Sequence, residues 1–106
     1  MARGILLVET FPASPEDAAA YHEWYEGIHL KEMTALDGVV SARRFAALGG
    51  DGPFIAIYEL DTDDIAAVQS RIREAAEAGR MSAPVGVATD PPARVVLCRE
   101  TASHTP

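Results

Sequence analysis

Two shortages in the sequence, of cysteine and of basic residues, exclude several classes of protein. A single cysteine, Cys98, stands among 106 residues, so no disulfide can form within one chain. Lysine and arginine number 9 against 16 acidic residues, which gives a formal net charge of −7. Binding to nucleic acid depends on neutralising phosphates with basic side chains, and anionic membranes also attract basic segments. We therefore predict no nucleic-acid partner and no membrane partner.

Long hydrophobic runs are absent as well. A membrane-spanning helix requires about 20 apolar residues, and no run in the sequence approaches that length. The first residues, MARGILLVET, contain only a short apolar run, whereas a signal peptide requires a longer one followed by a small-residue cleavage site. Apolar residues nonetheless make up 48% of the chain, which is typical of a folded protein. We expect one domain over residues 1–106 and a cytoplasmic location.

Four segments have the composition of β-strands. They are residues 4–10, 39–48, 54–60 and 93–100. The glycine-rich segment GGDGP separates the second segment from the third and predicts a hairpin. Residues 80–92 are rich in proline and small side chains, and we expect them to form a mobile loop that closes over a pocket. Residues 103–106 are expected to be a frayed tail.

Two helices are predicted between these strands. Ser14 precedes a proline and two acidic residues, which is typical of a helix start, and Gly38 ends the region that follows. The second helix is expected to be capped by Asp61 or Thr62 and to end at Gly79. Its apolar stripe is predicted to comprise Ile65, Val68, Ile72, Ala75 and Ala76.

The order β-α-β-β-α-β predicts an α+β protein with a ferredoxin-like monomer. In that fold both helices cover one face of a four-stranded antiparallel sheet, and the other face normally meets water and shows alternating polarity. The first and last strands do not alternate, because residues 5–8 and 95–97 are apolar at successive positions. We therefore expect the second face to be covered by the same face of another copy, which would give a two-fold homodimer.

The most unusual segment is YHEWYEGIHL, residues 21–30, which contains the only Trp, two of the three Tyr and two of the three His. On a helical wheel one broad face carries Ala18, Tyr21, His22, Tyr25, Ile28, His29 and Met33, with Trp24 at its edge. Two interpretations are open. The polar tips find ordinary hydrogen-bond partners in a core, or the face lines a small-molecule pocket in which an imidazole transfers protons. The helix dipole would raise the pKa of His29 and burial would lower it.

A metal site is an alternative use of the same helix. His22, Glu26 and His29 are spaced at i, i+4 and i+7, which would place imidazole and carboxylate ligands along one side. The spacing matches no known zinc signature, and further ligands would have to come from distant segments. We therefore predict no metal and no other cofactor. Arg43 and Arg44 fall on opposite faces of their strand, where pairing with Glu59 or Glu9 is expected and an anionic ligand is the alternative.

The stretch WYEGIHLKEMTALDGVVSARRF, residues 24–45, resembles the dimeric α+β barrel superfamily, in particular its short EthD-like members. The residues that match the pattern of this family are Trp24, Tyr25, His29, Leu30, Gly38, Arg43, Arg44 and Phe45. Relatives commonly have proline where this chain has Lys31, so the helix is expected to continue here or to break less sharply. The resemblance implies a ferredoxin-like monomer, a face-to-face dimeric α+β barrel, and a cavity between the helices and the sheet.

Activities in this superfamily vary, and the resemblance does not decide the reaction. Our first hypothesis is an enzyme acting on an apolar, aromatic, polyketide or lactone-like molecule by cyclisation, isomerisation or cofactor-independent oxygenation. His29 would be the general acid/base and Tyr25 its catalytic partner. Substrate contacts are predicted for Tyr21, His22, Trp24 and Met33. The alternatives are a non-catalytic dimer that binds a small ligand and, third, a haem- or metal-binding protein.

Overall fold

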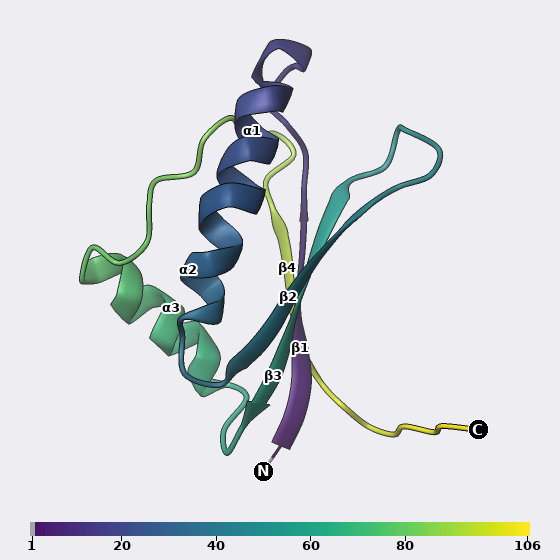
Figure 1. Ribbon diagram of the computed structural model, residues 1–106, viewed down its shortest axis with the longest axis vertical. Coiled ribbons are helices and arrows are strands. Elements are labelled where there is room, and N and C mark those ends of the chain that lie inside the picture. Colours follow the sequence, from purple (N-terminus) through teal and green to yellow (C-terminus); the bar gives the residue numbers. More distant parts are fainter. Residues whose placement is uncertain (1) are drawn as a thin grey trace.

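The computed structural model describes residues 2–106 as a four-stranded antiparallel sheet with helices on one face (Figure 1). Strands β1 (Ala2–Thr10) and β3 (Phe54–Thr62) lie in the centre of the sheet. Strands β2 (Val39–Ala46) and β4 (Arg94–Arg99) form its edges, which gives the order β2-β3-β1-β4. The α+β class and the antiparallel sheet are thus as predicted, and the arrangement is compatible with a ferredoxin-like fold.

The first helical region is continuous but not uniform. It opens with a 3₁₀ turn, η1 (Pro15–Asp17), which Ser14 caps by accepting the Asp17 N–H through its hydroxyl at 3.2 Å. Helix α1 (Ala18–Trp24) follows, then the π-helical turn η2 (Tyr25–His29) and helix α2 (Leu30–Thr34). The predicted cap at Ser14 is therefore confirmed, and the helix continues through Lys31 as expected.

The π-helical turn changes which side chains face the sheet. The Leu30 N–H donates to the Tyr25 carbonyl, five residues back, so this turn is wider than an α-helical one. A regular helix would place Ile28 beside Tyr21 on the buried face, as the helical wheel predicted. The wider turn instead rotates Ile28 outward, where it is 48% exposed, while Trp24 is buried at 5%. The predicted position of Ile28 on the buried face was wrong for that reason.

Helix α3 (Ala67–Glu77) begins later than predicted. Asp61 and Thr62 do not cap it, because both belong to β3. The chain then turns, and the Asp64 carboxylate accepts the Ala66 N–H at 3.1 Å just before the helix starts. Pairing with β1 extends the strand beyond the predicted end at residue 60, as far as Thr62.

The predicted apolar stripe of α3 is confirmed at its centre and wrong at its end. Val68 and Ala75 are fully buried, whereas Ala76 is exposed. Gly79 ends the helix with a positive φ of 78°, and the Arg80 N–H donates to the Ala75 carbonyl at 2.8 Å. None of the helices in residues 2–106 is both long enough and apolar enough to cross a membrane.

The core lies between the sheet and the helices. Side chains at the even positions of β1 and β3 point toward the helices, and Leu6 and Tyr58 are buried at 2% and 0% exposure. Tyr21 and Trp24 pack against them from the helical layer. This packing positions residues 21–33 over the middle of the sheet.

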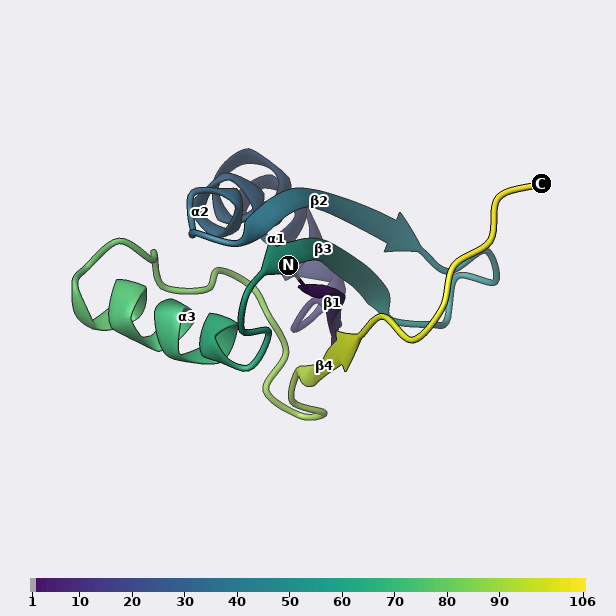
Figure 2. The ribbon, with the colours of Figure 1, turned by 90° about the horizontal axis from the view of Figure 1, so that it is seen from below.

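The outer face of the sheet carries apolar side chains but no helix. Figure 2 shows that the helical layer lies on the opposite side of the sheet. The partly exposed residues that define this outer face are Ile5, Leu7, Ile55, Ile57, Val96 and Cys98. A pocket of about 520 Å³ lies over part of it, lined by Ile5, Arg43, Glu59 and Cys98 among others. The two-sided apolar pattern predicted from the sequence is therefore present in the sheet.

Candidate functional site

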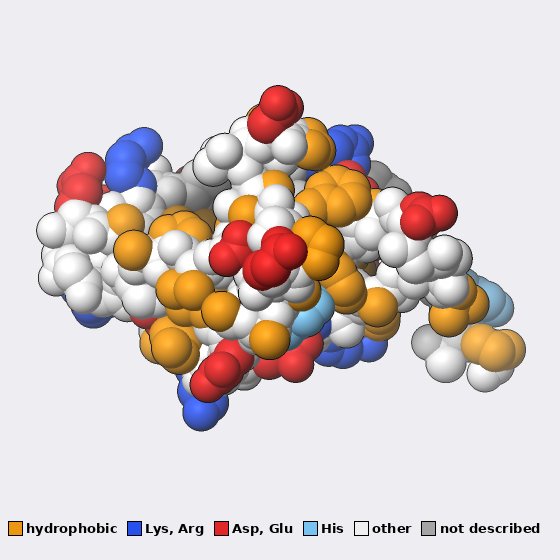
Figure 3. Space-filling model, turned by 90° about the horizontal axis from the view of Figure 1, so that it is seen from above, with side chains coloured by type: hydrophobic (Ala, Val, Ile, Leu, Met, Phe, Trp, Pro, Cys, Tyr) orange, Lys and Arg blue, Asp and Glu red, His pale blue; other side chains and the backbone are white. Residues whose placement is uncertain are grey.

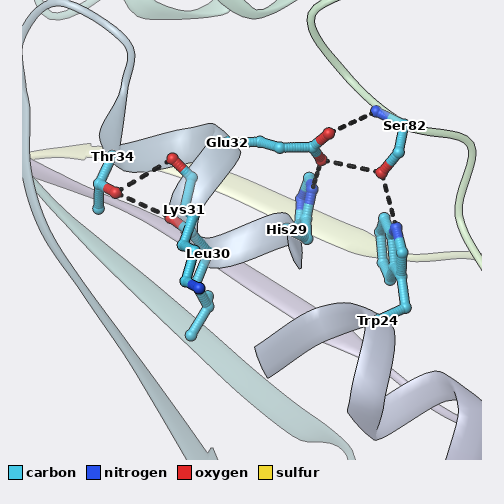
Figure 4. Close-up of polar contacts among 7 residues, drawn as sticks. All are labelled: Trp24, His29, Leu30, Lys31, Glu32, Thr34 and Ser82. Atoms are coloured by element: carbon cyan, nitrogen blue, oxygen red, sulfur yellow. Dashed lines mark hydrogen bonds and ion pairs between the residues drawn. The ribbon is translucent and has the colours of Figure 1, made fainter. Parts of the chain in front are cut away.

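His29 lies at the end of the π-helical turn with its ring held on two sides. The ring stacks on the Trp24 indole, with centroids 4.5 Å apart and planes 17° from parallel. Its Nδ1 lies 3.2 Å from Glu32 Oε1, one helical turn further along (Figure 4). The side chain is 21% exposed. Stacking and this bond together restrict the orientation of the imidazole.

Ser82, in the loop that precedes β4, completes the network around His29. Its backbone N–H donates to Glu32 Oε2 at 2.6 Å and its hydroxyl donates to Glu32 Oε1 at 3.0 Å. The Trp24 Nε1–H donates to the same hydroxyl at 2.8 Å. Sequence reasoning missed Glu32 and Ser82. The i, i+3 spacing to His29 was an available signal for Glu32, whereas nothing in the sequence pointed to Ser82.

The pKa values in this network favour a neutral imidazole beside an ionised carboxylate. Burial lowers the pKa of His29, and the contacts with Glu32 raise it by less. Burial raises the pKa of Glu32, but the hydrogen bonds from Ser82 and His29 outweigh that effect and lower it overall. An ionised carboxylate can only accept, so Nδ1 of His29 carries the proton and Nε2 keeps the free lone pair. The net direction for His29 is therefore a lowered pKa, with burial as the largest cause.

Tyr25 lies between this network and the interior of the protein. Its ring meets the His29 ring edge to face, with centroids 5.3 Å apart and planes at 90°. Burial raises its pKa, so the phenol stays protonated and can donate a hydrogen bond. Tyr25 and Tyr58 are 3% and 0% exposed, and both rings fill the space between helix and sheet.

The other predicted substrate-binding residues are separated by the fold. Tyr21 and Met33 are buried in the core, and the Tyr21 hydroxyl is hydrogen-bonded to Thr10 at 2.6 Å. His22 turns away from His29, toward Phe54 and Arg44. The two pockets described here are lined by none of the six predicted site residues.

Arg44 organises a second polar cluster on the opposite side of Tyr25 from the Trp24 stack. Its Nη1 donates to His22 Nδ1 at 2.9 Å and to Glu26 Oε2 at 2.8 Å. Its guanidinium carbon lies 4.3 Å from the centroid of the Tyr25 ring and 5.1 Å from that of Phe54. As predicted, Arg43 is on the other face of the strand, where it pairs with Glu59 at 3.3 Å.

The three residues considered as metal ligands have separate partners. His22 and Glu26 approach the Arg44 guanidinium, whereas His29 approaches Glu32. Within residues 2–106 no group of three or more His, Cys, Asp or Glu side chains has the arrangement of a metal site.

The loop over residues 80–92 is attached to the first helical region and to the segment that precedes it. Besides the contacts of Ser82, the Ala13 N–H donates to the Gly86 carbonyl at 2.7 Å and the Ala88 N–H to the Phe11 carbonyl at 2.8 Å. Gly86 has a positive φ of 68°, and a Cβ there would approach the Asp17 carbonyl to 2.9 Å. The loop therefore runs close along the helix and beside the His29 network.

Comparisons of the chain with family models, with curated proteins and with solved structures found no match. The resemblance to the dimeric α+β barrel superfamily therefore rests on residues 24–45, and the chemistry of the site has to be argued from its geometry.

Proposed function

We propose that the protein is an enzyme that uses His29 as a general acid/base on a small, apolar molecule of aromatic, polyketide or lactone type. The observation that carries the proposal is the 3.2 Å contact of His29 Nδ1 with Glu32. A carboxylate on one ring nitrogen fixes the tautomer and the ring orientation and leaves the other nitrogen to exchange protons. Nε2 has no hydrogen-bond partner among residues 2–106, which supports this role.

Tyr25 supplies the second group that proton transfer requires. When a base removes a proton next to a carbonyl, negative charge develops on the carbonyl oxygen. A protonated phenol in contact with the imidazole is suited to stabilise that charge, and burial keeps the Tyr25 phenol protonated. The reaction class that fits is cyclisation, isomerisation or cofactor-independent oxygenation through a substrate carbanion.

Substrate access requires movement of the loop over residues 80–92. His29 is only 21% exposed, and neither described pocket reaches it. Three hydrogen bonds of Ser82, two to Glu32 and one from Trp24, hold the loop against the helix beside His29. Release of these bonds opens the site, and their return excludes water during the reaction.

A homodimer formed through the outer face of the sheet belongs to this proposal. The support is the row of partly exposed apolar side chains on β1, β3 and β4, including Leu7 and Ile57. A charge at Leu7 would be buried without a partner, so Leu7→Glu is expected to give monomer or aggregate on gel filtration. Leu48→Glu, at a fully exposed loop position, is the matched control and should leave the dimer intact. A stable wild-type monomer at low micromolar concentration would contradict the dimer.

The filled interior favours one alternative, a non-catalytic dimer that binds a small ligand. Tyr21, Tyr25 and Tyr58 occupy the space in which a substrate would have to lie. On this second interpretation the network of His29, Glu32 and Ser82 only fastens the loop to the helix.

The deciding experiment begins with small molecules that co-purify with the protein, identified by mass spectrometry after denaturation. Turnover of the identified compound is then measured for the parent and for His29→Gln. Glutamine keeps hydrogen-bonding ability but cannot exchange protons at neutral pH, so the rate is expected to fall by roughly 10²–10⁴-fold. The fold and the dimer should be unchanged. A stable, fully active His29→Gln would remove the catalytic role, and a bound compound that the parent never converts would favour the ligand-binding alternative.

A further inference from the structure

Arg44 is a buried cation, and one of its hydrogen-bond donor groups has no partner among residues 2–106. Its side chain is only 7% exposed. The Nη1 group uses its two hydrogens on His22 and Glu26, whereas the Nη2 group, also buried, has no partner among residues 2–106. Buried donors are normally satisfied, because an unpaired one loses its hydrogen bonds to water without replacement. An acceptor is therefore missing beside Arg44.

The same residue lines a small pocket of mixed polar and apolar character. The pocket has a volume of about 130 Å³ and is lined by Glu26, Arg44, Phe45, Ala46 and Phe54. This volume is below the roughly 300–1,000 Å³ of drug-sized sites, so the pocket accepts a compact molecule. The Phe54 ring and the Arg44 guanidinium, which lie on the same face of the sheet, together suit a ligand with one apolar part and one group that accepts hydrogen bonds.

Glu26 indicates which accepting group this is. Its carboxylate reaches Nη1 from the surface at 2.8 Å, and the Glu26 side chain is 61% exposed. A carboxylate thus already occupies one position of the guanidinium, but it leaves Nη2 unpaired. A carboxylate that contacts one nitrogen of an arginine is held less firmly than one that engages both nitrogens, which is bound strongly and in a fixed orientation. A ligand carboxylate could therefore displace Glu26 into solvent.

We propose that Arg44 anchors a binding site for a small carboxylate with an apolar body, and that Glu26 acts as its internal competitor. This site is separate from the His29 network. Arg44 can only donate, so His22 Nδ1 accepts in their contact at 2.9 Å. The aromatic rings around the guanidinium keep it in place when Glu26 leaves.

The test is an NMR titration of the ¹⁵N-labelled full chain with benzoate, and with uncharged benzamide as the matched probe at equal ionic strength. Benzoate is expected to shift the amide signals of Phe45, Ala46 and Phe54 in a saturable way, with an affinity about tenfold above that of benzamide. Equal affinity for the two probes would overturn the carboxylate assignment. The absence of saturable shifts with either probe would overturn the site.

Variants decide whether Arg44 and Glu26 have the proposed roles. Glu26→Gln removes the competing charge and should tighten benzoate binding several-fold, whereas unchanged or weaker binding would contradict the competition. Arg44→Lys keeps the charge but loses the paired donors and should weaken benzoate binding about tenfold.

Ala46→Leu tests the site without changing Arg44, in case Arg44→Lys does not fold. The larger side chain fills the pocket from an exposed position and should abolish benzoate binding, and Ala93→Leu, also at an exposed position, is the control. His29→Gln should bind benzoate as the parent does, so this inference and the proposed catalytic role fail separately.

Discussion

His22 and His29 stand on the same helical region, and the fold gives them opposite hydrogen-bond roles. The Nδ1 of His29 faces the Glu32 carboxylate and donates a hydrogen bond, while the Nδ1 of His22 faces the Arg44 guanidinium and accepts one. Burial lowers the pKa of His29. Tyr25 lies between the two clusters and contacts both His29 and Arg44. The comparison teaches that the chemistry of an imidazole depends on the charge of its partner, which residue type and helical spacing do not reveal.

The largest expected difference between the His29 cluster and the Arg44 cluster is in catalytic rate. It is measured by comparing the rates of the Glu32→Gln and Glu26→Gln variants. Glu32→Gln removes the charge that orients His29, and we expect the rate with an identified substrate to fall about 10–100-fold, less than the roughly 10²–10⁴-fold contribution of a general acid/base itself. Glu26→Gln changes the same side chain in the Arg44 cluster and should leave the rate within a few-fold. Equal losses of rate in the two variants would contradict the proposal that the His29 cluster is catalytic and the Arg44 cluster is not.

Ser82→Ala should produce a smaller effect, on stability and loop motion. The variant loses the hydroxyl that joins Trp24 and Glu32 but keeps the backbone N–H that donates to Glu32. We expect a loss of about 1–2 kcal/mol in the free energy of unfolding and faster hydrogen exchange in residues 80–92. Thr101→Ala, in the exposed tail, is the control. Exchange in the loop that stays as slow as in the strands would argue against a movable lid.

The smallest expected effect is a pH dependence of stability that arises from His29. Its pKa in the folded protein is below the ordinary value of 6.5, so the unfolded chain binds a proton more readily. The contribution of neutral His29 is therefore fully present above pH 6.5 and is lost as the pH falls through the folded pKa. Denaturant midpoints measured from pH 8 to 5 should fall less for His29→Gln than for the parent. An identical fall in both proteins would mean that burial does not set this pKa.

Sequence reasoning located the helix that carries the site but misplaced some of its side chains. The helical wheel assumes a constant angle per residue, and the π-helical turn at Tyr25–His29 breaks that assumption. Ile28 was placed on the buried face but is 48% exposed. Glu32 was within reach of a spacing argument, whereas Ser82 is 50 residues away along the chain from it.

The sequence alone determined the order of strands and helices, the cap at Ser14, the end of the helix at Gly79 and the apolar outer face of the sheet. These features depend on local propensity and on alternation within single segments, which neighbouring residues decide. The tertiary structure alone decided the contact of Ser82 with Glu32, the burial that lowers the pKa of His29 and the unpaired Nη2 donor of Arg44. Each of them arises where segments distant in the chain meet, and there the local dielectric and the available partners are set by packing.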